Sequence, residues 1–366
     1  MVIVFSKASP QVPWCGIMIR WQLFSRSNMN SKTLEENKTT LALLMQEIHL
    51  QVDAAMREDL AAALTGCDPA LSETIEYAIF GGGKKVRPAL VTTCSRLCGR
   101  DDPALYRLAA AFEYLHVASL IHDDIIDKAS QRRGRSTIAA QYGPSKAILA
   151  GDWLLSRSML IVAELTGMQG LRIFCQATEG MVNGEFLQIR HVGHLSLQEK
   201  DYFSIIACKT GNLIASACTI GALYADGDAQ QMSRIKQYGQ KLGSAFQVID
   251  DLLDYQGEEK NTGKPVGNDL AEGKITLPLL RALHKATEQD RRTMEYLIKH
   301  SLEEPGTYKK IFTFIEQNQG FLSAGKTAAE LIQQAKDALV IFDAPEHAAQ
   351  LVLLHSLADY ILARNK

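Results

Sequence analysis

Apolar residues recur with helical spacing along most of this chain, and no segment shows sustained alternation of apolar and polar positions. There is no proline between Pro144 and Pro265, and this stretch is rich in Ala, Leu, Ile, Gln and Lys, which favour helices. The pattern predicts successive helices at residues 39–65, 69–80, 85–98, 104–127, 145–165, 170–190, 197–225, 229–256, 274–286, 289–300, 307–318, 321–342 and 346–363. The sequence therefore predicts an all-α protein.

Two polar, glycine-containing connections stand out between these helices, at residues 128–143 and 257–273. Each connection directly follows a cluster of aspartates with the pattern DDxxD. The two clusters consist of Asp123, Asp124 and Asp127, and of Asp250, Asp251 and Asp254. Residues four apart lie on the same face of a helix, so each motif should point its first and last aspartates in one direction.

A polar stripe extends from each motif back along an otherwise apolar helix. His116 and Ser119 continue the stripe of the first motif, and Gln247 continues that of the second. Such a stripe faces water, a partner or a cavity, because unpaired polar groups are costly to bury in an apolar core. One DDxxD motif alone is compatible with an ordinary solvated helix face. Two copies, each followed by a basic, glycine-bearing loop, favour a cation-binding site.

The residue types indicate which cation this site would hold. Oxygen ligands without histidine or cysteine suit a hard cation. Calcium usually takes more ligands from one compact loop, and the sequence contains no EF-hand pattern. Magnesium uses one or two carboxylates and completes its shell with water and substrate phosphates. The six aspartates therefore predict Mg²⁺ that clamps a diphosphate between two helices.

Basic residues in four segments supply positive charge for phosphates. The candidates are Lys84 and Arg87 in a glycine-rich turn, Arg132 and Arg133 after the first aspartate motif, Lys209 and Thr210 within a predicted helix, and Lys264 after the second motif. Arginine is well suited to bidentate phosphate contacts. Gly211, directly after Thr210, is unfavourable inside a helix and marks that segment for attention. Each segment alone is also compatible with a solvated loop; together they predict sites for two diphosphates.

The composition changes this interpretation little. The 366 residues are 46% apolar and 22% charged with a formal net charge of -2, which is typical of a globular protein and does not favour nucleic acid as a partner. No apolar run has the length needed to span a bilayer, so no transmembrane segment is expected. The seven cysteines are scattered and odd in number, which favours a reducing, cytoplasmic setting.

Residues 1–34 differ from the rest of the chain, because they contain basic residues and no acidic residue before Glu35. A basic targeting segment is one interpretation. Upstream sequence ahead of a start at Met29 and a disordered tail are the others. No apolar stretch with a small-residue cleavage site follows, so export is not expected. The remaining residues, 35–366, are predicted to form one domain.

In their order along the chain, the motifs resemble those of the trans-isoprenyl diphosphate synthases, also called polyprenyl synthetases. The matched segments are GGKKVRP, HVASLIHDDIIDKASQRRGRST, GDWLL, GEFLQ, KTGNL and GSAFQVIDDLLDYQGEEKNTGKPVGNDLAEGKITLPLL, and the resemblance covers residues 40–366. It implies an all-α bundle around a deep central cavity, a homodimer, and condensation of isopentenyl diphosphate with an allylic diphosphate in the domain 35–366. A second small subunit and a peripheral membrane contact for product release are left open.

The resemblance also implies roles for individual residues. The six aspartates would hold Mg²⁺ on the allylic diphosphate, and Lys209 is counted with them as catalytic. The allylic side would be contacted by Arg132, Lys209, Thr210, Gln247 and Lys264. Isopentenyl diphosphate would be bound by Lys84, Arg87, His116 and Arg133. At Lys85 the family commonly has arginine. This departure should not affect magnesium binding.

Small residues before the first motif predict a long product. Ala118 and Ser119 lie roughly one turn below the metal site, at about 1.5 Å per residue, where the tail of an allylic chain must pass. Short-chain members of the family often have bulky aromatics there. The next large side chain at a similar angle is Phe112, about 16 Å below Asp123. We therefore expect a heptaprenyl to decaprenyl product of the kind used for quinone side chains; close helix packing is the alternative explanation of the small residues.

Other activities fit parts of the sequence. A class I terpene cyclase shares the first DDxxD motif but normally carries a different second metal motif. A non-catalytic partner subunit should have lost aspartates, and this chain keeps all six. A calcium-binding helical module would bind calcium without substrate. Within the family, a short-chain farnesyl or geranylgeranyl diphosphate synthase is the alternative.

Overall fold

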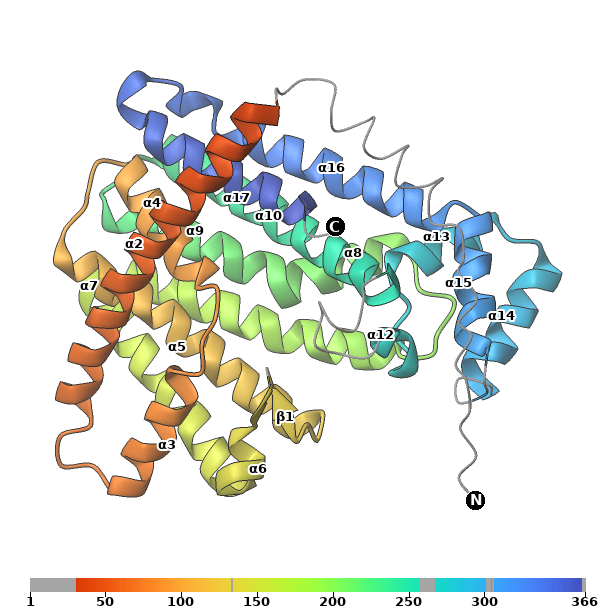
Figure 1. Cartoon of the computed structure of the whole chain (residues 1–366), viewed down its shortest axis with the longest axis horizontal. Coiled ribbons are helices and arrows are strands. Elements are labelled where there is room, and N and C mark those ends of the chain that lie inside the picture. The colour runs from red at the N-terminus through yellow and green to blue at the C-terminus, as the bar shows by residue number, and fades with distance from the viewer. Residues whose placement is uncertain (1–30, 133, 257–266, 301–303, 305, 364–366) are drawn as a thin grey trace, which may run out of the picture.

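A computed structural model gives the fold for residues 31–132, 134–256, 267–300, 304 and 306–363 (Figure 1). Within these residues the chain is almost entirely helical, and its one sheet is an antiparallel pair of two-residue strands. The all-α prediction is therefore confirmed.

The helices follow one another with short connections. They are α2 (Ser31–Ala63), α3 (Pro69–Ile79), α4 (Val86–Leu97), α5 (Pro103–Ile126), α6 (Ile138–Tyr142), α7 (Pro144–His191), α8 (Glu199–Ile206), α9 (Asn212–Tyr224), α10 (Ala229–Gln256), α12 (Asn268–Ala271), α13 (Leu277–Lys285), α14 (Glu288–His300), α15 (Thr307–Gln317), α16 (Gly320–Ala338) and α17 (Ala348–Ala363). The shorter elements are the strands β1 (Gln131–Arg132) and β2 (Arg135–Ser136), the π-helical turn η1 (Ala207–Gly211), and the 3-10 turns η2 (Val340–Phe342) and η3 (Pro345–His347).

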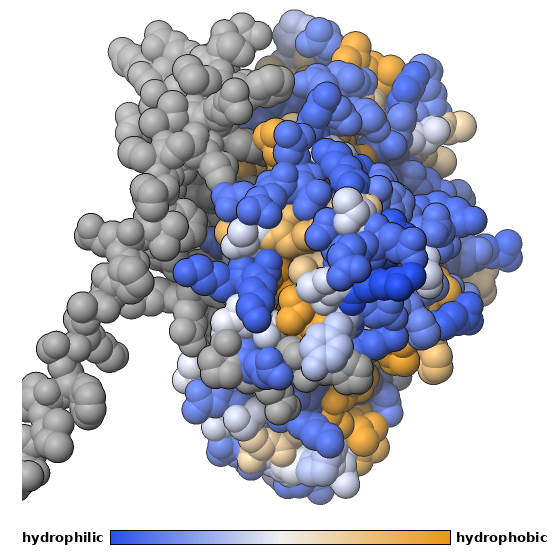
Figure 2. All heavy atoms as spheres, turned by 90° about the vertical axis from the view of Figure 1, so that its right-hand side faces the viewer, coloured by the Kyte–Doolittle hydropathy of each residue, from blue (hydrophilic) through white to orange (hydrophobic). Residues whose placement is uncertain are grey.

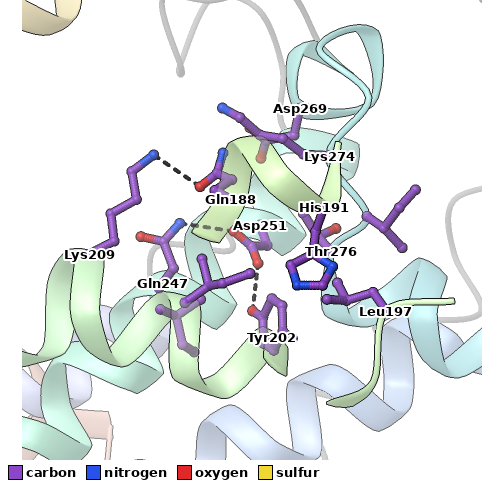
Figure 3. Close-up of a pocket in the computed structure, with 13 residues that line it drawn as sticks. Gln188, His191, Leu197, Tyr202, Lys209, Gln247, Asp251, Asp269, Lys274 and Thr276 are labelled. Carbon is purple, nitrogen blue, oxygen red and sulfur yellow. Dashed lines mark hydrogen bonds and ion pairs between the residues drawn. The ribbon is translucent and has the colours of Figure 1, made fainter. Parts of the chain in front are cut away.

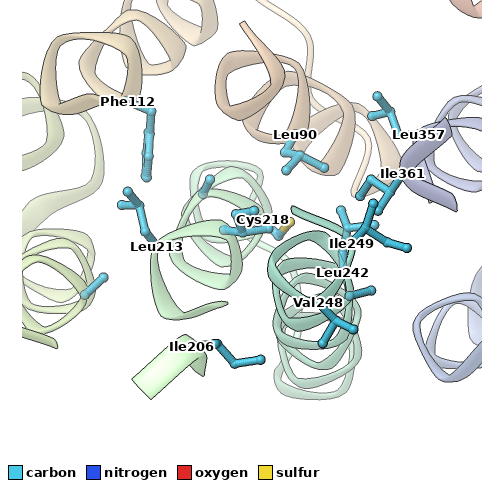
Figure 4. Packing of buried hydrophobic residues seen from close by; sticks show 14 of the residues in the cluster. Leu90, Phe112, Ile206, Leu213, Cys218, Leu242, Val248, Ile249, Leu357 and Ile361 are labelled. Carbon is cyan, nitrogen blue, oxygen red and sulfur yellow. The ribbon is translucent and has the colours of Figure 1, made fainter. Parts of the chain in front are cut away.

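The core is built around α9, whose residues are apolar or small on every side, as expected for a helix surrounded by other helices. Figure 4 shows side chains of α4, α5, α10 and α17 gathered around it, among them Leu90 and Phe112. α9 approaches α4 so closely that a Cβ on Gly221 would lie 2.3 Å from the carbonyl oxygen of Val91. Only glycine permits that contact.

The central position of α9 also explains an apolar segment that is longer than predicted, since no apolar run long enough to span a bilayer was expected. By length and composition Glu199–Tyr224 is able to cross a membrane, but 67% of its most apolar 18-residue stretch is buried inside the protein. Its apolarity is thus that of a core helix. The face of the molecule shown in Figure 2 is mainly hydrophilic, with apolar residues in small groups between polar ones.

Two helices differ from the prediction in an informative way. α2 begins at Ser31, before the predicted start at residue 39, because the polar residues in between are good helix formers with no glycine or proline to stop the helix. α7 consists of two helical segments that meet at a sharp kink, where Gly167 has non-helical backbone angles (φ 63°, ψ -164°). This bend separates the two helices predicted at 145–165 and 170–190.

The connections contain more structure than predicted. The connection at 128–143 holds the β1–β2 hairpin and the short helix α6, which Thr137 caps by accepting a hydrogen bond from the backbone N–H of Ala140. α13 begins at Leu277 rather than at 274, because Pro278 suits the first turn of a helix. The last two helices of the prediction begin or end in 3-10 turns. These differences lie in short connections or at helix ends, where short polar segments carry little periodicity.

Candidate functional site

The first aspartate motif lies at the C-terminal end of α5. Asp124 is buried, and its carboxylate accepts a hydrogen bond from Arg132 Nε of the hairpin at 2.8 Å. Asp123 and Asp127 are accessible. Asp127 lies near enough to Asp123 for the two charges to repel, as expected for residues four apart.

The second motif lies in the last two turns of α10 and has a similar division. Asp251 is buried; the Tyr202 hydroxyl donates to it at 2.6 Å and Gln247 Nε2 at 2.9 Å. Asp250 is accessible. In both motifs, then, the second aspartate is held by protein groups and the first faces solvent.

The last aspartate of the second motif is held by the segment that follows it. Asp254 is half-buried, and its two carboxylate oxygens accept hydrogen bonds from the backbone N–H groups of Asn268 and Asp269, each at 3.1 Å. Burial, and then the charge of Asp269, raise the pKa of Asp254 to about 6, although these hydrogen bonds oppose the shift.

The pKa values of two further carboxyls are raised. For Asp123, whose side chain remains accessible, partial desolvation by the surrounding protein is the main cause, with Lys209 opposing the shift and Glu185 adding to it. Burial raises the pKa of Asp251 well above its usual range, and the charge of Asp269 raises it further. Carboxylates that are destabilised by burial and by each other are stabilised by an added cation. This is the electrostatic setting of a metal site.

Lys209 connects the two motifs. Its ammonium group lies 2.6 Å from a carboxylate oxygen of Glu185 and donates a hydrogen bond to Gln188 Oε1 at 3.0 Å. Its positive charge reaches Asp123, where it opposes the rise in the pKa of that carboxyl without cancelling it. It also lines a pocket together with Asp251, as Figure 3 shows. One lysine therefore lies between the ends of α5 and α10.

The backbone around Lys209 is unusual. Residues 207–211 form a π-helical turn between α8 and α9, a geometry that often marks functional sites. Gly184 of α7 packs directly on this turn, since a Cβ there would lie 2.8 Å from the backbone nitrogen of Lys209. Thr210 Oγ1 donates to Gln247 Oε1 at 2.9 Å, which joins the turn to α10. The segment that the sequence marked by its glycine is thus a distinct structural element.

The pocket beside Asp251 has a volume of about 80 Å³. It is lined by Gln188, His191, Leu197, Tyr202, Ile205, Ile206, Lys209, Gln247, Asp251, Asp269, Lys274, Ile275 and Thr276. Lys274 lies 2.5 Å from a carboxylate oxygen of Glu272 and 3.4 Å from one of Asp269. Burial alone would lower the pKa of Lys274, but Asp269 and Glu272 outweigh it and raise the pKa.

The residues predicted for isopentenyl diphosphate lie around the start of α4 and on α5. Lys84 donates a hydrogen bond to the Tyr360 hydroxyl of α17 at 2.6 Å. Arg87 is largely enclosed, and its Nε is buried with no hydrogen-bond partner. Burial lowers the pKa of Arg87, and nearby Glu113 opposes this. His116 is half-buried, and its carbonyl oxygen accepts a hydrogen bond from Ser119 Oγ at 2.8 Å.

The remaining predicted residues fall into two groups. Ala118 and Phe112 are buried in α5, and the Phe112 ring packs edge-on against Phe174 of α7 with the ring centroids 5.3 Å apart. Arg133 and Lys264 lie outside the described residues.

Among the described residues, no group of three or more His, Cys, Asp or Glu side chains is arranged to hold a metal ion by itself. The aspartates fit a cation that takes few protein ligands and completes its shell with water or phosphate oxygens, which is the behaviour of Mg²⁺.

Sequence reasoning assigned no role to several residues of this site. They are Glu113, Glu185, Gln188, Tyr202, Asp269 and Lys274. Glu185 and Gln188 are three apart in the quoted segment GEFLQ, so helical spacing placed them on one face. Tyr202 carries no local signal, because only the packing of α8 on α10 brings it to Asp251.

Comparison with known proteins places this site in context. The family model described as Polyprenyl synthetase matches residues 68–315. The octaprenyl diphosphate synthase of Haemophilus influenzae is 32% identical over 320 residues, which is 86% of this chain and 96% of that protein. A short chain isoprenyl diphosphate synthase of Methanothermobacter thermautotrophicus is 35% identical over 297 residues, 79% of this chain and 89% of that protein.

The fold is also similar to that of solved structures. A polyprenyl synthase from Caulobacter crescentus, solved in complex with calcium and isoprenyl diphosphate, has a TM-score of 0.80 and 30% sequence identity. The similarity covers 90% of this chain and 98% of that one.

Proposed function

The chain belongs to the polyprenyl synthetase family, and from this premise we propose that it condenses isopentenyl diphosphate with an allylic diphosphate to give a long all-trans polyprenyl diphosphate, used for quinone side chains. The observation that carries the proposal is the position of Lys209, on a π-helical turn between two aspartate-bearing helix ends. The single core, which extends from Ile48 to Ile361, supports one catalytic domain over residues 35–366.

We assign Mg²⁺ to the two aspartate motifs. Direct contact is assigned to the accessible Asp123, Asp127 and Asp250. The other three, Asp124, Asp251 and Asp254, already accept hydrogen bonds from protein groups and orient the site. When bound, Mg²⁺ neutralises charge on the leaving diphosphate. Loss of turnover on treatment with EDTA, and recovery on addition of magnesium, are the expected results of the simplest test.

Positively charged groups on the allylic side favour departure of the diphosphate. Lys209, Thr210 and Gln247 form one wall of this site, and the half-buried Lys274 adds a cation near Asp251. Arg132 and Lys264 are assigned to the same diphosphate. The carbon–oxygen bond breaks with its electron pair going to the diphosphate, and the positive charges stabilise that anion as it forms.

Isopentenyl diphosphate is assigned to Lys84, Arg87, His116 and Arg133. Its double bond attacks the allylic cation, so one carbon–carbon bond forms. The attack leaves the positive charge on the other carbon of the former double bond. A proton then leaves the carbon next to it, the electron pair of that C–H bond forms the new double bond, and we assign the departed diphosphate as the base. The growing chain passes down an apolar tunnel beside α5, where exclusion of water protects the cation.

The chain-length assignment rests on α5 below the first motif. Ala118 and Ser119 are too small to block a prenyl tail, and Phe112 is the first large side chain at a similar angle. The octaprenyl name of one relative supports a long product. The name of the short-chain relative keeps a farnesyl or geranylgeranyl product as the second candidate.

A homodimer is the proposed assembly. Large apolar side chains are exposed in a row on the second half of α7, where Val182, Phe186 and Ile189 are 53%, 67% and 58% exposed. Residues at such spacing form one helix face. A second copy of this chain would cover that face, and we propose that the dimer is cytoplasmic, with no transmembrane segment and no nucleic-acid partner.

The test is incubation of the purified protein with labelled isopentenyl diphosphate, farnesyl diphosphate and magnesium, followed by chromatography of the products. Incorporation of many isopentenyl units is the expected result. Products of three or four units would leave the family intact and replace the long-chain assignment. Consumption of the allylic substrate without isopentenyl diphosphate would indicate a cyclase, and activity only with a second protein would indicate a partner subunit.

A further inference from the structure

Side chains on one face of α2 contact the turn that leads into α4. His49, Asp53 and Arg57 are four residues apart and so lie one above the other on the helix. Each contacts a different part of the turn at residues 80–85. The result is a continuous contact between a helix outside the catalytic motifs and the turn that carries Lys84.

These contacts are specific. His49 Nε2 donates a hydrogen bond to the Lys84 carbonyl oxygen at 2.7 Å. The Arg57 guanidinium carbon lies 4.1 Å from the centroid of the Phe80 ring. Between them, the Lys85 ammonium lies 2.5 Å from a carboxylate oxygen of Asp53, and the Lys85 side chain is only 10% exposed.

Lys85 has a strained backbone. Its φ of 43° and ψ of 42° lie in the left-handed region, which side chains other than glycine adopt at a cost. It is also the N-terminal cap of α4, and its carbonyl oxygen accepts the N–H of Ala89. The left-handed residue therefore sets the direction in which the chain leaves Lys84 and enters the helix turn containing Arg87.

We infer that Asp53 is a positioning residue for the isopentenyl site: its ion pair with Lys85 holds this strained residue, and through it Lys84 and Arg87, in the orientation that binds isopentenyl diphosphate. This inference rests on the proposed function, because that function assigns Lys84 and Arg87 to isopentenyl diphosphate. Asp53 and Lys85 themselves make no contact with substrate in this account.

The test asks whether Lys85→Gly removes the effect of losing Asp53. A role of Asp53 in overall stability alone does not predict that result. Asp53→Ala should raise the dissociation constant of isopentenyl diphosphate, measured by calorimetry, and its KM by about tenfold, because the strained turn loses its partner. The KM of the allylic primer should change by less than about twofold. Glycine adopts the left-handed region freely. Asp53→Ala should therefore have no effect in a Lys85→Gly background, whose own affinity stays near that of the wild type.

Glu58→Ala is the matched control, because Glu58 is an exposed acid on the same helix. Equal increases in both KM values, or a Lys85→Gly variant that binds isopentenyl diphosphate as poorly as Asp53→Ala, would overturn the inference. So would unchanged binding by a folded Asp53→Ala protein. Those outcomes affect the inference alone, because the wild type still binds isopentenyl diphosphate. A wild-type protein that binds no isopentenyl diphosphate would instead overturn the proposed function, and the inference with it.

Discussion

At the scale of single residues, the two aspartate motifs use their members differently. Asp124 and Asp251 are buried and accept hydrogen bonds from protein donors, whereas Asp123 and Asp250 face solvent. Buried carboxylates that accept hydrogen bonds fix the ends of their helices. Accessible carboxylates are available to a cation. The first aspartates should therefore matter for turnover and little for folding.

Asp123→Ala or Asp250→Ala is expected to lower kcat by about a thousandfold, because each removes a carboxylate assigned to hold the Mg²⁺ that neutralises the departing diphosphate. Circular dichroism and the thermal midpoint should stay close to those of the wild type, since neither side chain is buried in the core. Single-turnover assays at saturating magnesium provide the measurement. Near-normal activity in either variant would contradict the assignment of the metal.

Many of the residues that the structure brings together around the two motifs were predicted as site residues because they carry local signals in the sequence. The DDxxD repeats, and Gln247 one turn before the second motif, follow from helical spacing. Lys209 was marked by Gly211, an unfavourable residue for a helix. Tyr202 and Lys274 carry no such signal: the first reaches Asp251 from another helix, and the second acts through contacts made after its loop folds.

At the scale of elements, the π-helical turn depends on a close contact with α7. Gly184→Ala would bring a Cβ within 2.8 Å of the Lys209 backbone nitrogen and 3.0 Å of the Cys208 Cβ, and neither atom can move without the backbone, so the turn must move. A small displacement of a positioned catalytic group costs about 100-fold in rate. We expect kcat to fall by about that factor in a folded protein. Gly180→Ala is the control, because the nearest atom to a Cβ there is the side-chain nitrogen of Asn212 at 3.4 Å. Equal losses of kcat in both variants would argue against the importance of the Gly184 contact.

Three helices are joined at a buried carboxylate far from the motifs in sequence. Asp59 of α2 is 1% exposed, and it pairs with Arg107 of α5 and Arg157 of α7. Tyr114 donates a further hydrogen bond to it at 3.2 Å. Burial would raise the pKa of Asp59, but the hydrogen bonds from Arg157 and Arg107 outweigh it and lower the pKa.

Asp59→Ala is expected to destabilise the fold by about 3 kcal/mol, because it leaves two partly buried arginines without a counter-charge. The lowered folded-state pKa means that the ion pairs contribute fully above about pH 4. That contribution is lost as pH falls below the unfolded-state value and through the folded one. Urea unfolding between pH 7 and pH 3 measures both effects. The difference in stability between wild type and variant should shrink towards pH 3; a constant difference would contradict the role of the charge.

Helix positions were largely predictable, whereas helix ends and short connections were not. The apolar period gives the long helices, and Gly167 divides α7 as the pattern indicates. The start of α2 at Ser31 and the hairpin at β1 and β2 were not predicted, since short polar segments carry no period. The hairpin is held instead by tertiary contacts, such as the Tyr77 hydroxyl donating to the Ser136 carbonyl oxygen at 3.0 Å.

At the scale of the whole molecule, the exposed apolar face of α7 gives the proposed dimer a direct test. Phe186→Glu places a charge in the centre of that face and is expected to weaken dimerisation by about a hundredfold. Sedimentation equilibrium over a range of protein concentrations measures this. Leu322→Glu on α16 is the matched control, since Leu322 is also an exposed apolar residue, at 54%. A monomeric wild type, or equal effects of the two substitutions, would remove α7 as the interface.

Product length depends on what lies below the metal site in the assembled bundle. Ala118 is buried, and Ser119, half-buried, uses its hydroxyl to bond the His116 carbonyl oxygen. Neither can close a tunnel by size. Phe112 packs against Phe174, so the first large side chain on this side of α5 is already held in place by a second aromatic ring. These two rings are candidates for the floor of the proposed tunnel.

Ala118→Phe is therefore expected to shorten the product to the farnesyl or geranylgeranyl class while sparing the first condensations, because the new ring lies about 7.5 Å below Asp123 along the helix. Ser119→Phe, one residue closer to the motif and less buried, makes the same test where Ala118→Phe does not fold. Phe112→Ala should have the opposite effect and add isoprene units. Chromatography of the products from labelled isopentenyl diphosphate gives the lengths. A wild type that stops at farnesyl diphosphate, or folded variants with the wild-type product, would place the tunnel on another face of α5.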